Sequence, residues 1–470
     1  MIIHIRNFGK IESADIDFAN LTIFVGENNS GKIYIMQLIY GLINFFSEKE
    51  FNDFLGNFRW KYNSEEIIRE ILESNDEDIS KNILEIKADD RNFYNNFQNA
   101  LNDFISRNKE KIVEKTFNTH NLSIGSLSIE FGKIVDDLTI QCTQNLKNTS
   151  KAKISFHFNK SVNHTITSIL FAQNNQYKSM NNIVKKSILT TILLMSFGIS
   201  QYQLTDLPIL YLPASRSGLM LLYTNFLAEY NDDKTFQNDD VVYQVNDGQT
   251  SENRYGLTEP IYDFLMFMLK HKTSEMISDK DREIISFINE NIINGTMEKT
   301  GTTMRYKPAS SEHSLPIYLS SSLVSELSPI YQILSGIQKY TFILYDEIET
   351  CQHPTKQLQL ARLLVRMVNA GYRMVVSTHS DTMAAAINNL ITISFKEKKD
   401  ELMSKLGYEK EDMLESANVK AYQFIIGKDG KTKVEEVKSH FSVGVGFDFD
   451  IFNYANDKIY QDAVEIAEVD

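Results

Sequence analysis

Leu-Thr-Ile-Phe-Val-Gly-Glu-Asn-Asn-Ser-Gly-Lys-Ile, at residues 21–33, is the stretch that decides the fold. Residues 21–25 form an apolar run that reads as a buried strand. The apolar residues after the loop have helical spacing: Ile35, Ile39, Leu42, Ile43 and Phe46. Residues 26–32 match the phosphate-binding pattern Gly-x-x-x-x-Gly-Lys, whose glycines let backbone N–H groups surround phosphates while the lysine reaches the β and γ oxygens. The stretch therefore predicts nucleotide binding in an α/β domain, against the alternative of a chance glycine-rich turn.

The last position of this pattern is unusual, because Ile33 stands where serine or threonine normally supplies a hydroxyl to Mg²⁺. Isoleucine keeps the β-branched shape of threonine but has no oxygen. The sequence predicts a retained fold, weakened Mg²⁺ binding and slow ATP turnover. A natural regulatory ATPase and a loss-of-function variant explain the residue equally well. The loop residues expected to contact ATP are Gly26, Asn28, Asn29, Ser30, Gly31, Lys32 and Ile33.

The composition describes a globular protein of 470 residues, 42% of them hydrophobic and 11% aromatic. A formal charge of -14 excludes a surface that is basic everywhere but leaves room for a local basic groove. Cys142 and Cys351 lack metal-ligand spacing and argue against a disulfide framework. The start is charged too early for a signal peptide, and the most apolar uncharged stretch, residues 187–199, is too short to cross a bilayer. We therefore expect a cytoplasmic protein without a membrane partner.

Changes in pattern divide the chain into four segments. Residues 1–46 and 205–395 read as two parts of one nucleotide-binding head. Between them, residues 47–204 are rich in asparagine and lysine and almost free of glycine and proline. Their periodic apolar positions favour an inserted helical and β domain with a core of its own. Residues 396–470 are expected to form a C-terminal hairpin and an acidic helix.

Local patterns also predict individual elements within these segments. They indicate helices at 97–117, 182–199, 258–271 and 279–292, strands at 127–131 and 154–158, a loop at 230–256 and a hairpin from 421–426 and 432–437.

A second apolar run, residues 341–345, ends in the carboxylate pair Asp346 and Glu347. Ligands of α/β sheets bind at such strand ends. Asp346 suits a contact to Mg²⁺, directly or through water, and Glu347 suits polarisation of the attacking water, since phosphoryl transfer chiefly needs positioning and charge stabilisation. The alternative is an exposed strand end, where acidic residues are common.

A third buried run, residues 374–378, places His379 at its tip. A neutral histidine there can hydrogen-bond a γ-phosphate or the attacking water. A purely structural histidine is the alternative. The separation of Lys32 from Asp346 is far too long for a small GTPase-like domain. A large insertion at this place is typical of ATPases that dimerise head to head.

Together these motifs resemble those of the ABC-type ATPases of the OLD, RecF and SMC kind. The resemblance rests on residues 21–32, on the carboxylate pair followed by Glu349 and His353-Pro354, and on Ser377-Thr378-His379-Ser380. It is strongest to the stand-alone OLD-like ATPases, often labelled AAA ATPases, of bacterial anti-phage systems of the PARIS or Septu kind. Residues 213–218 also resemble a segment of that group. The resemblance covers residues 1–46 and 205–395.

The resemblance implies an ABC-ATPase head, a mixed sheet with flanking helices, that carries an inserted helical and β-arm domain and uses ATP and Mg²⁺. It also implies a head-to-head homodimer or a higher even-numbered oligomer. Residues 320–327 would hold the signature motif, with Ser321 and Ser322 at the γ-phosphate of the other subunit. They depart from the usual Ser-Gly-Gly pattern. A serine-rich helix N-terminus, with Glu326 completing a capping turn, is the alternative.

By the same resemblance, the protein would be a sensor or scaffold in anti-phage defence, with hydrolysis by Glu347 releasing the heads. Its effector, a nuclease, would be encoded separately, and nucleic acid or a phage protein could be the trigger. Asp448-Phe449-Asp450 matches the Asp-x-Asp pattern of a nuclease motif, but a helix N-cap is the better interpretation of these residues. The alternatives are a DNA-repair ATPase of the RecF type, which binds DNA directly, and an assembly module that does not hydrolyse its nucleotide.

Overall fold

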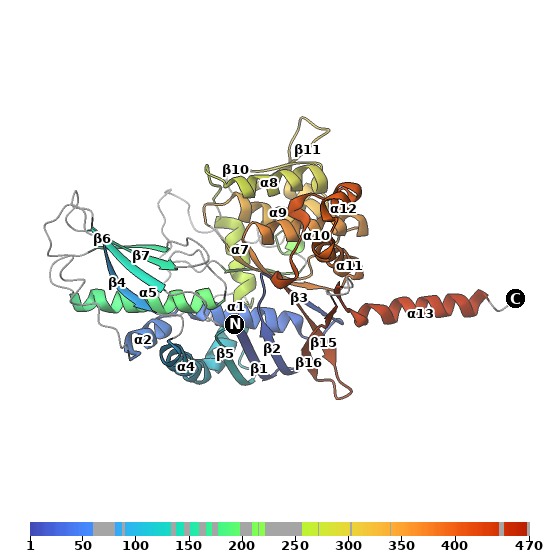
Figure 1. The fold of residues 1–470 in the computed structure, drawn as a ribbon. Coiled ribbons are helices and arrows are strands. Elements are labelled where there is room, and N and C mark those ends of the chain that lie inside the picture. Colours follow the sequence, from blue (N-terminus) through green and yellow to red (C-terminus); the bar gives the residue numbers. More distant parts are fainter. Residues whose placement is uncertain are drawn as a thin grey trace.

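One mixed sheet organises the molecule (Figure 1). The computed structural model describes residues 1–59, 80–86, 90–132, 138–144, 151–158, 166–171, 177–197, 209–214, 216–220, 256–270, 272–300, 303–338, 340–440 and 446–467. Within these residues nine strands form the sheet in the order β5 (Ile124–Glu130), β1 (Ile2–Phe8), β2 (Ile11–Asp17), β16 (Thr432–Glu436), β15 (Val419–Ile426), β3 (Leu21–Gly26), β14 (Arg373–Thr378), β13 (Phe342–Tyr345) and β9 (Ile209–Leu212). Neighbours from β15 to β9 are parallel, whereas β5, β1 and β2 are antiparallel.

Helices cover both faces of this sheet. One face packs against α1 (Lys32–Phe45), α2 (Lys49–Asn57), α4 (Arg91–Phe117) and α5 (Tyr177–Ser196). The other packs against α7 (Glu259–Lys270), α8 (Asp279–Phe287), α9 (Ser322–Ser335), α10 (Pro354–Asn369) and α11 (Asp381–Thr392). Along β3, Phe24 joins the first core while Ile23 and Val25 join the second. The sequence prediction of an α/β head with a mixed sheet and flanking helices is therefore confirmed.

Shorter elements surround the main sheet. A π-helical turn, η1 (Ile288–Ile293), continues α8, and α12 (Lys399–Leu406) follows α11. Among the described residues, smaller sheets comprise β10 (Gly295–Thr300), β11 (Thr303–Pro308) and β12 (Leu315–Pro316); β17 (Ser439–His440) and β18 (Gly446–Phe447); and β4 (Ser80–Ile86), β6 (Leu138–Gln144), β7 (Lys151–Phe158) and β8 (Ile166–Phe171). Single 3₁₀ turns are η2 (Ile317–Leu319), η3 (Ile393–Phe395), η4 (Lys410–Asp412) and η5 (Ser416–Asn418). The last helix, α13 (Asp450–Ala467), runs away from the body at the right of Figure 1.

The stretch expected to form a separate inserted core contributes instead to the head. Strand β5 pairs with β1 along its whole length, and α4 and α5 share one hydrophobic core with α1. The reason is that the apolar face of α4 buries against α1, with the rings of Phe104 and Phe45 stacked 5.9 Å apart. The sheet of β4, β6, β7 and β8 projects as an arm (Figure 1). The boundaries 47–204 stay a proposal for where the insertion begins and ends.

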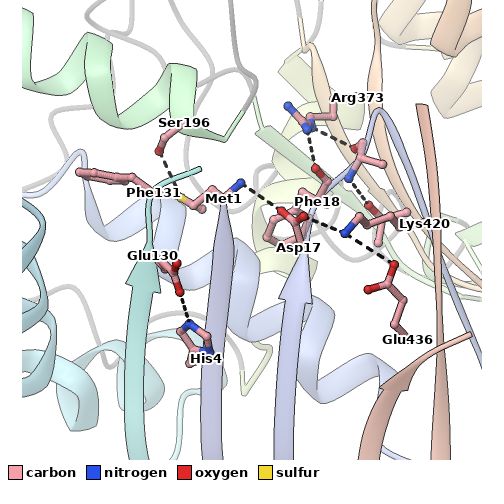
Figure 2. Close-up of polar contacts among 12 residues, drawn as sticks. Met1, His4, Asp17, Phe18, Glu130, Phe131, Ser196, Arg373, Lys420 and Glu436 are labelled. Carbon is pink, nitrogen blue, oxygen red and sulfur yellow. Dashed lines mark hydrogen bonds and ion pairs between the residues drawn. The ribbon is translucent and has the colours of Figure 1, made fainter. Parts of the chain in front are cut away.

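The predicted C-terminal hairpin is also part of the head. Strands β15 and β16 pair as expected, but β15 then pairs in parallel with β3, beside the phosphate loop. Figure 2 shows polar contacts that tie these distant segments together. Asp17 accepts from the N-terminal amine of Met1 at 3.1 Å and from Nζ of Lys420 at 2.8 Å. His4 Nε2 lies 3.4 Å from Glu130 Oε2. Segments 1–17, 124–130 and 419–436 thus form one sheet.

Most of the predicted elements have counterparts in the structure. The helices expected at 97–117, 182–199 and 258–271 correspond to α4, α5 and α7, and the strands at 127–131 and 154–158 to β5 and β7. The helix expected at 279–292 is α8 followed by η1. The loop expected at 230–256 lies outside the described residues, except for its last position.

Candidate nucleotide-binding site

Four parallel strands bring the candidate site together. Strands β3, β14, β13 and β9 are neighbours in the sheet, so their carboxyl ends lie along one edge. The phosphate loop follows β3, His379 follows β14, and Asp346 follows β13. Residues 213–216 follow β9. The predicted phosphate-loop, carboxylate and histidine motifs thus lie at the sheet edge where α/β proteins bind ligands.

The phosphate loop has a backbone that favours glycine at two positions. Gly31, the residue before α1, has φ of 98°, and a Cβ there would lie 2.6 Å from Ile11 Cδ1. A Cβ on Gly26 would lie 2.8 Å from Cβ of Phe424. Asn29 also has a positive φ, of 59°. The loop therefore turns tightly into the N-terminus of α1, whose free N–H groups and dipole favour an anion.

Lys32 is the buried cation of this loop. Its Nζ donates to the carbonyl oxygens of Gly26 and Glu27, both at 2.9 Å, and to Ser30 Oγ at 3.2 Å. Burial lowers the pKa of Lys32 to about 8, although the nearby carboxylates of Asp346, Glu347 and Glu349 oppose that shift. A buried ammonium held mainly by neutral oxygens suits an added phosphate, which would stabilise its charge. This side chain therefore fits a bound triphosphate.

The depressed pKa of Lys32 gives a testable pH dependence. Because the folded pKa of about 8 lies below the ordinary 10.5, the unfolded chain binds more protons between these values. The contribution of Lys32 to the free energy of unfolding therefore rises with pH across that window. We expect the difference in unfolding free energy between wild type and Lys32→Met to move by about 2 kcal/mol in favour of wild type from pH 7.5 to pH 9.5. Urea unfolding of the nucleotide-free proteins measures it, and parallel pH profiles would contradict it.

Asp346 is the buried carboxylate of the pair. Ser377 Oγ donates to its Oδ1 at 2.5 Å, and Tyr211 Oη donates to its Oδ2 at 3.2 Å. Burial and the nearby charge of Glu347 raise the pKa of Asp346, while the hydrogen bond from Ser377 opposes this shift. The sequence singled out neither Tyr211 nor the hydroxyl of Ser377 as a partner of this carboxylate. Both come from neighbouring strands, where pairing register decides which side chains meet.

Glu347 has a different environment from its neighbour. Its backbone adopts φ of 43° and its N–H donates to Ser377 Oγ at 2.8 Å. Its Oε1 lies 3.5 Å from His379 Nε2, and its Oε2 accepts from Thr350 Oγ1 at 3.2 Å. The contact with His379 lowers the pKa of Glu347, so the carboxylate is ionised near neutral pH. Glu347 is therefore an ionised, half-exposed carboxylate next to the buried Asp346. In this position Glu347 can accept a proton from water.

His379 contacts protein on two sides. Its ring faces Glu347, and its backbone N–H donates to Glu349 Oε1 at 2.5 Å. Burial raises the pKa of Glu349. The role that the sequence suggests for His379, a hydrogen bond to a γ-phosphate or to the attacking water, stays a prediction, and the structure adds a contact of the ring with Glu347. In this position the histidine can orient the carboxylate.

The signature-like segment lies at the N-terminus of α9. Ser321 is the residue before the helix, Ser322 is its first residue, and both side chains are exposed. Ser321 makes no capping hydrogen bond with its side chain. Glu326 completes no capping turn either, because it forms a buried ion pair with Arg216, with Nε 2.8 Å from Oε2. The capping alternative for this segment is therefore wrong, since the acidic residue pairs with an arginine distant in sequence.

Ile33 offers no ligand atom for a metal ion in the candidate site. Its side chain is 43% exposed and carries no oxygen. Across the part of the chain that the structure describes, no group of three or more His, Cys, Asp and Glu side chains could hold a metal ion. The buried carboxylate of Asp346 fits Mg²⁺, with nucleotide phosphates and water as its remaining oxygen ligands. The residues thus fit ATP well and Mg²⁺ with one hydroxyl fewer than the usual pattern.

Solved structures and one family model match this chain. One solved structure is the SMC head bound to the C-winged-helix domain of ScpA, with 13% identity over 93% of this chain and 97% of that chain and a TM-score of 0.35. Another is the SMC head domain from Thermotoga maritima, with 11% identity over 93% and 98% and a TM-score of 0.32. No curated protein matches this chain. No helix among the described residues is long and apolar enough to span a membrane. The family model described as the AAA ATPase domain matches residues 1–384, so the chain belongs to the AAA ATPase domain family.

Proposed function

We propose that this protein binds ATP with Mg²⁺ and hydrolyses it as a head-to-head homodimer or a higher even-numbered oligomer. The observation that carries the proposal is the meeting of Lys32 with Asp346 and Glu347 at one sheet edge, close enough for the carboxylates to act on the lysine pKa. The loop amides and Lys32 would hold the phosphates, and Asp346 would hold the metal. Mg²⁺ supplies neutralisation of phosphate charge when it is bound.

Hydrolysis would depend on Glu347 as the group that orients water and accepts its proton. The water oxygen would attack the γ-phosphorus while the bond from that phosphorus to the β–γ bridging oxygen breaks and ADP leaves. The contact with His379 would keep this carboxylate ionised and fix its direction. Ile33 supplies no hydroxyl to the metal, which supports slow turnover in this chain. The same feature favours a second candidate function, an assembly module in which ATP joins the heads without being hydrolysed.

The exposed tip of α9 supports the dimer. Ser321 and Ser322 present hydroxyls and a helix N-terminus to solvent, an arrangement that favours a phosphate carried by another subunit. In a two-fold dimer each tip would complete the site of its partner, so every active site would draw residues from both chains.

Mixing two inactive variants tests this composite site. In an Ile33→Thr background, Lys32→Met should abolish nucleotide binding, and Ser322→Arg should block the tip of α9. A one-to-one mixture should regain about a quarter of full activity, since half of the dimers are mixed and each of those has one intact site. Phosphate release measures it. Lys32→Met subunits mixed with the double variant, which carries both changes, should stay inactive. A first mixture without recovered activity would contradict sites shared between subunits.

The cellular role that we propose is that of a cytoplasmic sensor or scaffold in anti-phage defence, which controls a separately encoded effector, a nuclease. What supports it is the resemblance of the phosphate-loop, carboxylate and histidine motifs to OLD-like ATPases of such systems. Nucleic acid or a phage protein would be the trigger. Phage plating on cells that carry this gene with its neighbours tests the role. Protection that disappears with Lys32→Met supports it, and equal plating with and without the genes contradicts it.

A further inference from the structure

Arg216 connects directly to the backbone of the carboxylate pair. The side chain is fully buried, and its Nη1 donates to the carbonyl oxygens of Pro213 at 2.6 Å and Asp346 at 2.8 Å. Its Nη2 donates to the carbonyl oxygen of Glu347 at 3.4 Å. The guanidinium also lies over the ring of Tyr345, 4.6 Å from its centre. A shift of the backbone of Asp346 and Glu347, here called the carboxylate turn, would therefore act on this arginine.

The other side of the same arginine is attached to helix α9. Arg216 Nε lies 2.8 Å from Oε2 of Glu326. Oε1 of Glu326 accepts from the backbone N–H of Ser217 at 3.1 Å and from its hydroxyl at 2.8 Å. Both oxygens of the buried carboxylate are thus engaged by the segment that follows β9. Residues 216 and 217 and α9 are therefore held together as a unit.

The position of the buried ion pair between Arg216 and Glu326 suggests a role other than stabilising the fold. Replacing a buried ion pair with apolar side chains often leaves stability unchanged or higher, so burial of this pair is weak evidence for a stabilising role. Glu326 lies one turn after Ser321 and Ser322, the exposed tip that we assign to the nucleotide of the partner subunit. Packed side chains and rigid elements of this kind can carry coupling between sites.

We propose that Arg216 and Glu326 are positioning residues that transmit nucleotide occupancy at one site to the α9 tip serving the other site. When the carboxylate turn moves on ATP binding, Arg216 moves with the carbonyl groups of Asp346 and Glu347, and Glu326 carries the displacement to α9. The inference rests on the proposed ATP binding. In the proposed dimer, the coupling route runs within each subunit. It leads from the nucleotide that the subunit binds to helix α9 of the same subunit.

Hydrogen exchange of the full-length protein tests this route. The measured quantity is amide exchange in residues 320–325 with and without ATP, alongside the affinity for a fluorescent ATP analogue. Every protein compared carries Ser322→Arg, so that contact with the partner's nucleotide cannot change the exchange, and wild type here means wild type at Arg216 and Glu326. In wild type, ATP should change exchange in this segment by at least about fivefold. The double variant Arg216→Met with Glu326→Leu keeps similar volumes and should still bind ATP, but its segment should no longer respond. If this variant does not fold, Glu326→Gln, which keeps the acceptor for Ser217, takes its place.

A matched control distinguishes coupling from the mere loss of a buried ion pair. Arg366 and Asp412 form such a pair at 2.7 Å, between α10 and η4, within a cluster that also contains Arg362 and Glu409. The variant Arg366→Met with Asp412→Leu should keep the response of residues 320–325 to ATP. The inference is overturned if ATP still changes the amide exchange of residues 320–325 in the Arg216 and Glu326 variant. It is also overturned if wild type binds ATP but shows no change of exchange in this segment. Wild type that does not bind ATP overturns the proposed function itself.

Discussion

A Glu347→Gln variant is expected to hydrolyse ATP at least about 100-fold more slowly than the parent protein, while its affinity for ATP stays the same. Glutamine keeps the size of the side chain and its contact with Thr350 but cannot accept a proton from water. Because we expect Ile33 to slow turnover, the comparison is made in an Ile33→Thr background. Phosphate release gives the rate, and a fluorescent ATP analogue gives the affinity.

The control for this comparison is Glu397→Gln, the same chemical change at an exposed position outside the candidate site. It should leave both the rate and the affinity unaltered. Retention of the parental rate by Glu347→Gln would show that another group activates the water, and the assignment of the carboxylate pair would then be wrong.

An Arg216→Ala variant is expected to lose about 3 to 5 kcal/mol of unfolding free energy. The substitution leaves Glu326 buried without its countercharge and removes the donors to the carbonyl oxygens of Asp346 and Glu347. Urea unfolding followed by circular dichroism measures the change. This is the largest single-residue effect on stability that we expect, since the pair joins β9, the carboxylate turn and α9.

A surface ion pair gives the matching control for Arg216. Lys458 and Asp462 lie 2.5 Å apart on the exposed side of α13, and Lys458→Ala should change the unfolding free energy by less than about 0.5 kcal/mol. A loss below about 1 kcal/mol for Arg216→Ala would contradict the view that Glu326 depends on this arginine for its burial.

The sequence was sufficient to predict the strand ends that form the candidate site. Strands β3, β13 and β14 are buried on both faces of a parallel sheet, so they read as short, nearly continuous apolar runs. Each run is followed directly by polar residues, which places Lys32, Asp346 and His379 at the same edge. The prediction succeeded because both the strand signal and the polar residues are local in sequence.

Partners that are distant in sequence could not be predicted in the same way. The hairpin of β15 and β16 has a clear local signal, but its pairing with β3 joins residues near 420 to residues near 23. The core shared by α1, α4 and α5 is equally non-local. The roles of Tyr211, Ser377 and Arg216 depend on strand register and on the approach of α9. A hydroxyl or an arginine on a single strand does not reveal which carboxylate it will meet.

ATP hydrolysis and oligomer mass, measured together for this chain, for Ile33→Thr and for Glu347→Gln, test whether this sheet edge binds ATP. We expect ATP to increase the mass of all three proteins, because each keeps Lys32 and the phosphate loop. Ile33→Thr should turn over ATP at least about tenfold faster than the parent chain, because the added hydroxyl completes the metal ligands, and Glu347→Gln should show no turnover. Three proteins that neither bind ATP nor change mass with it would contradict the assignment of this sheet edge as an ATP site.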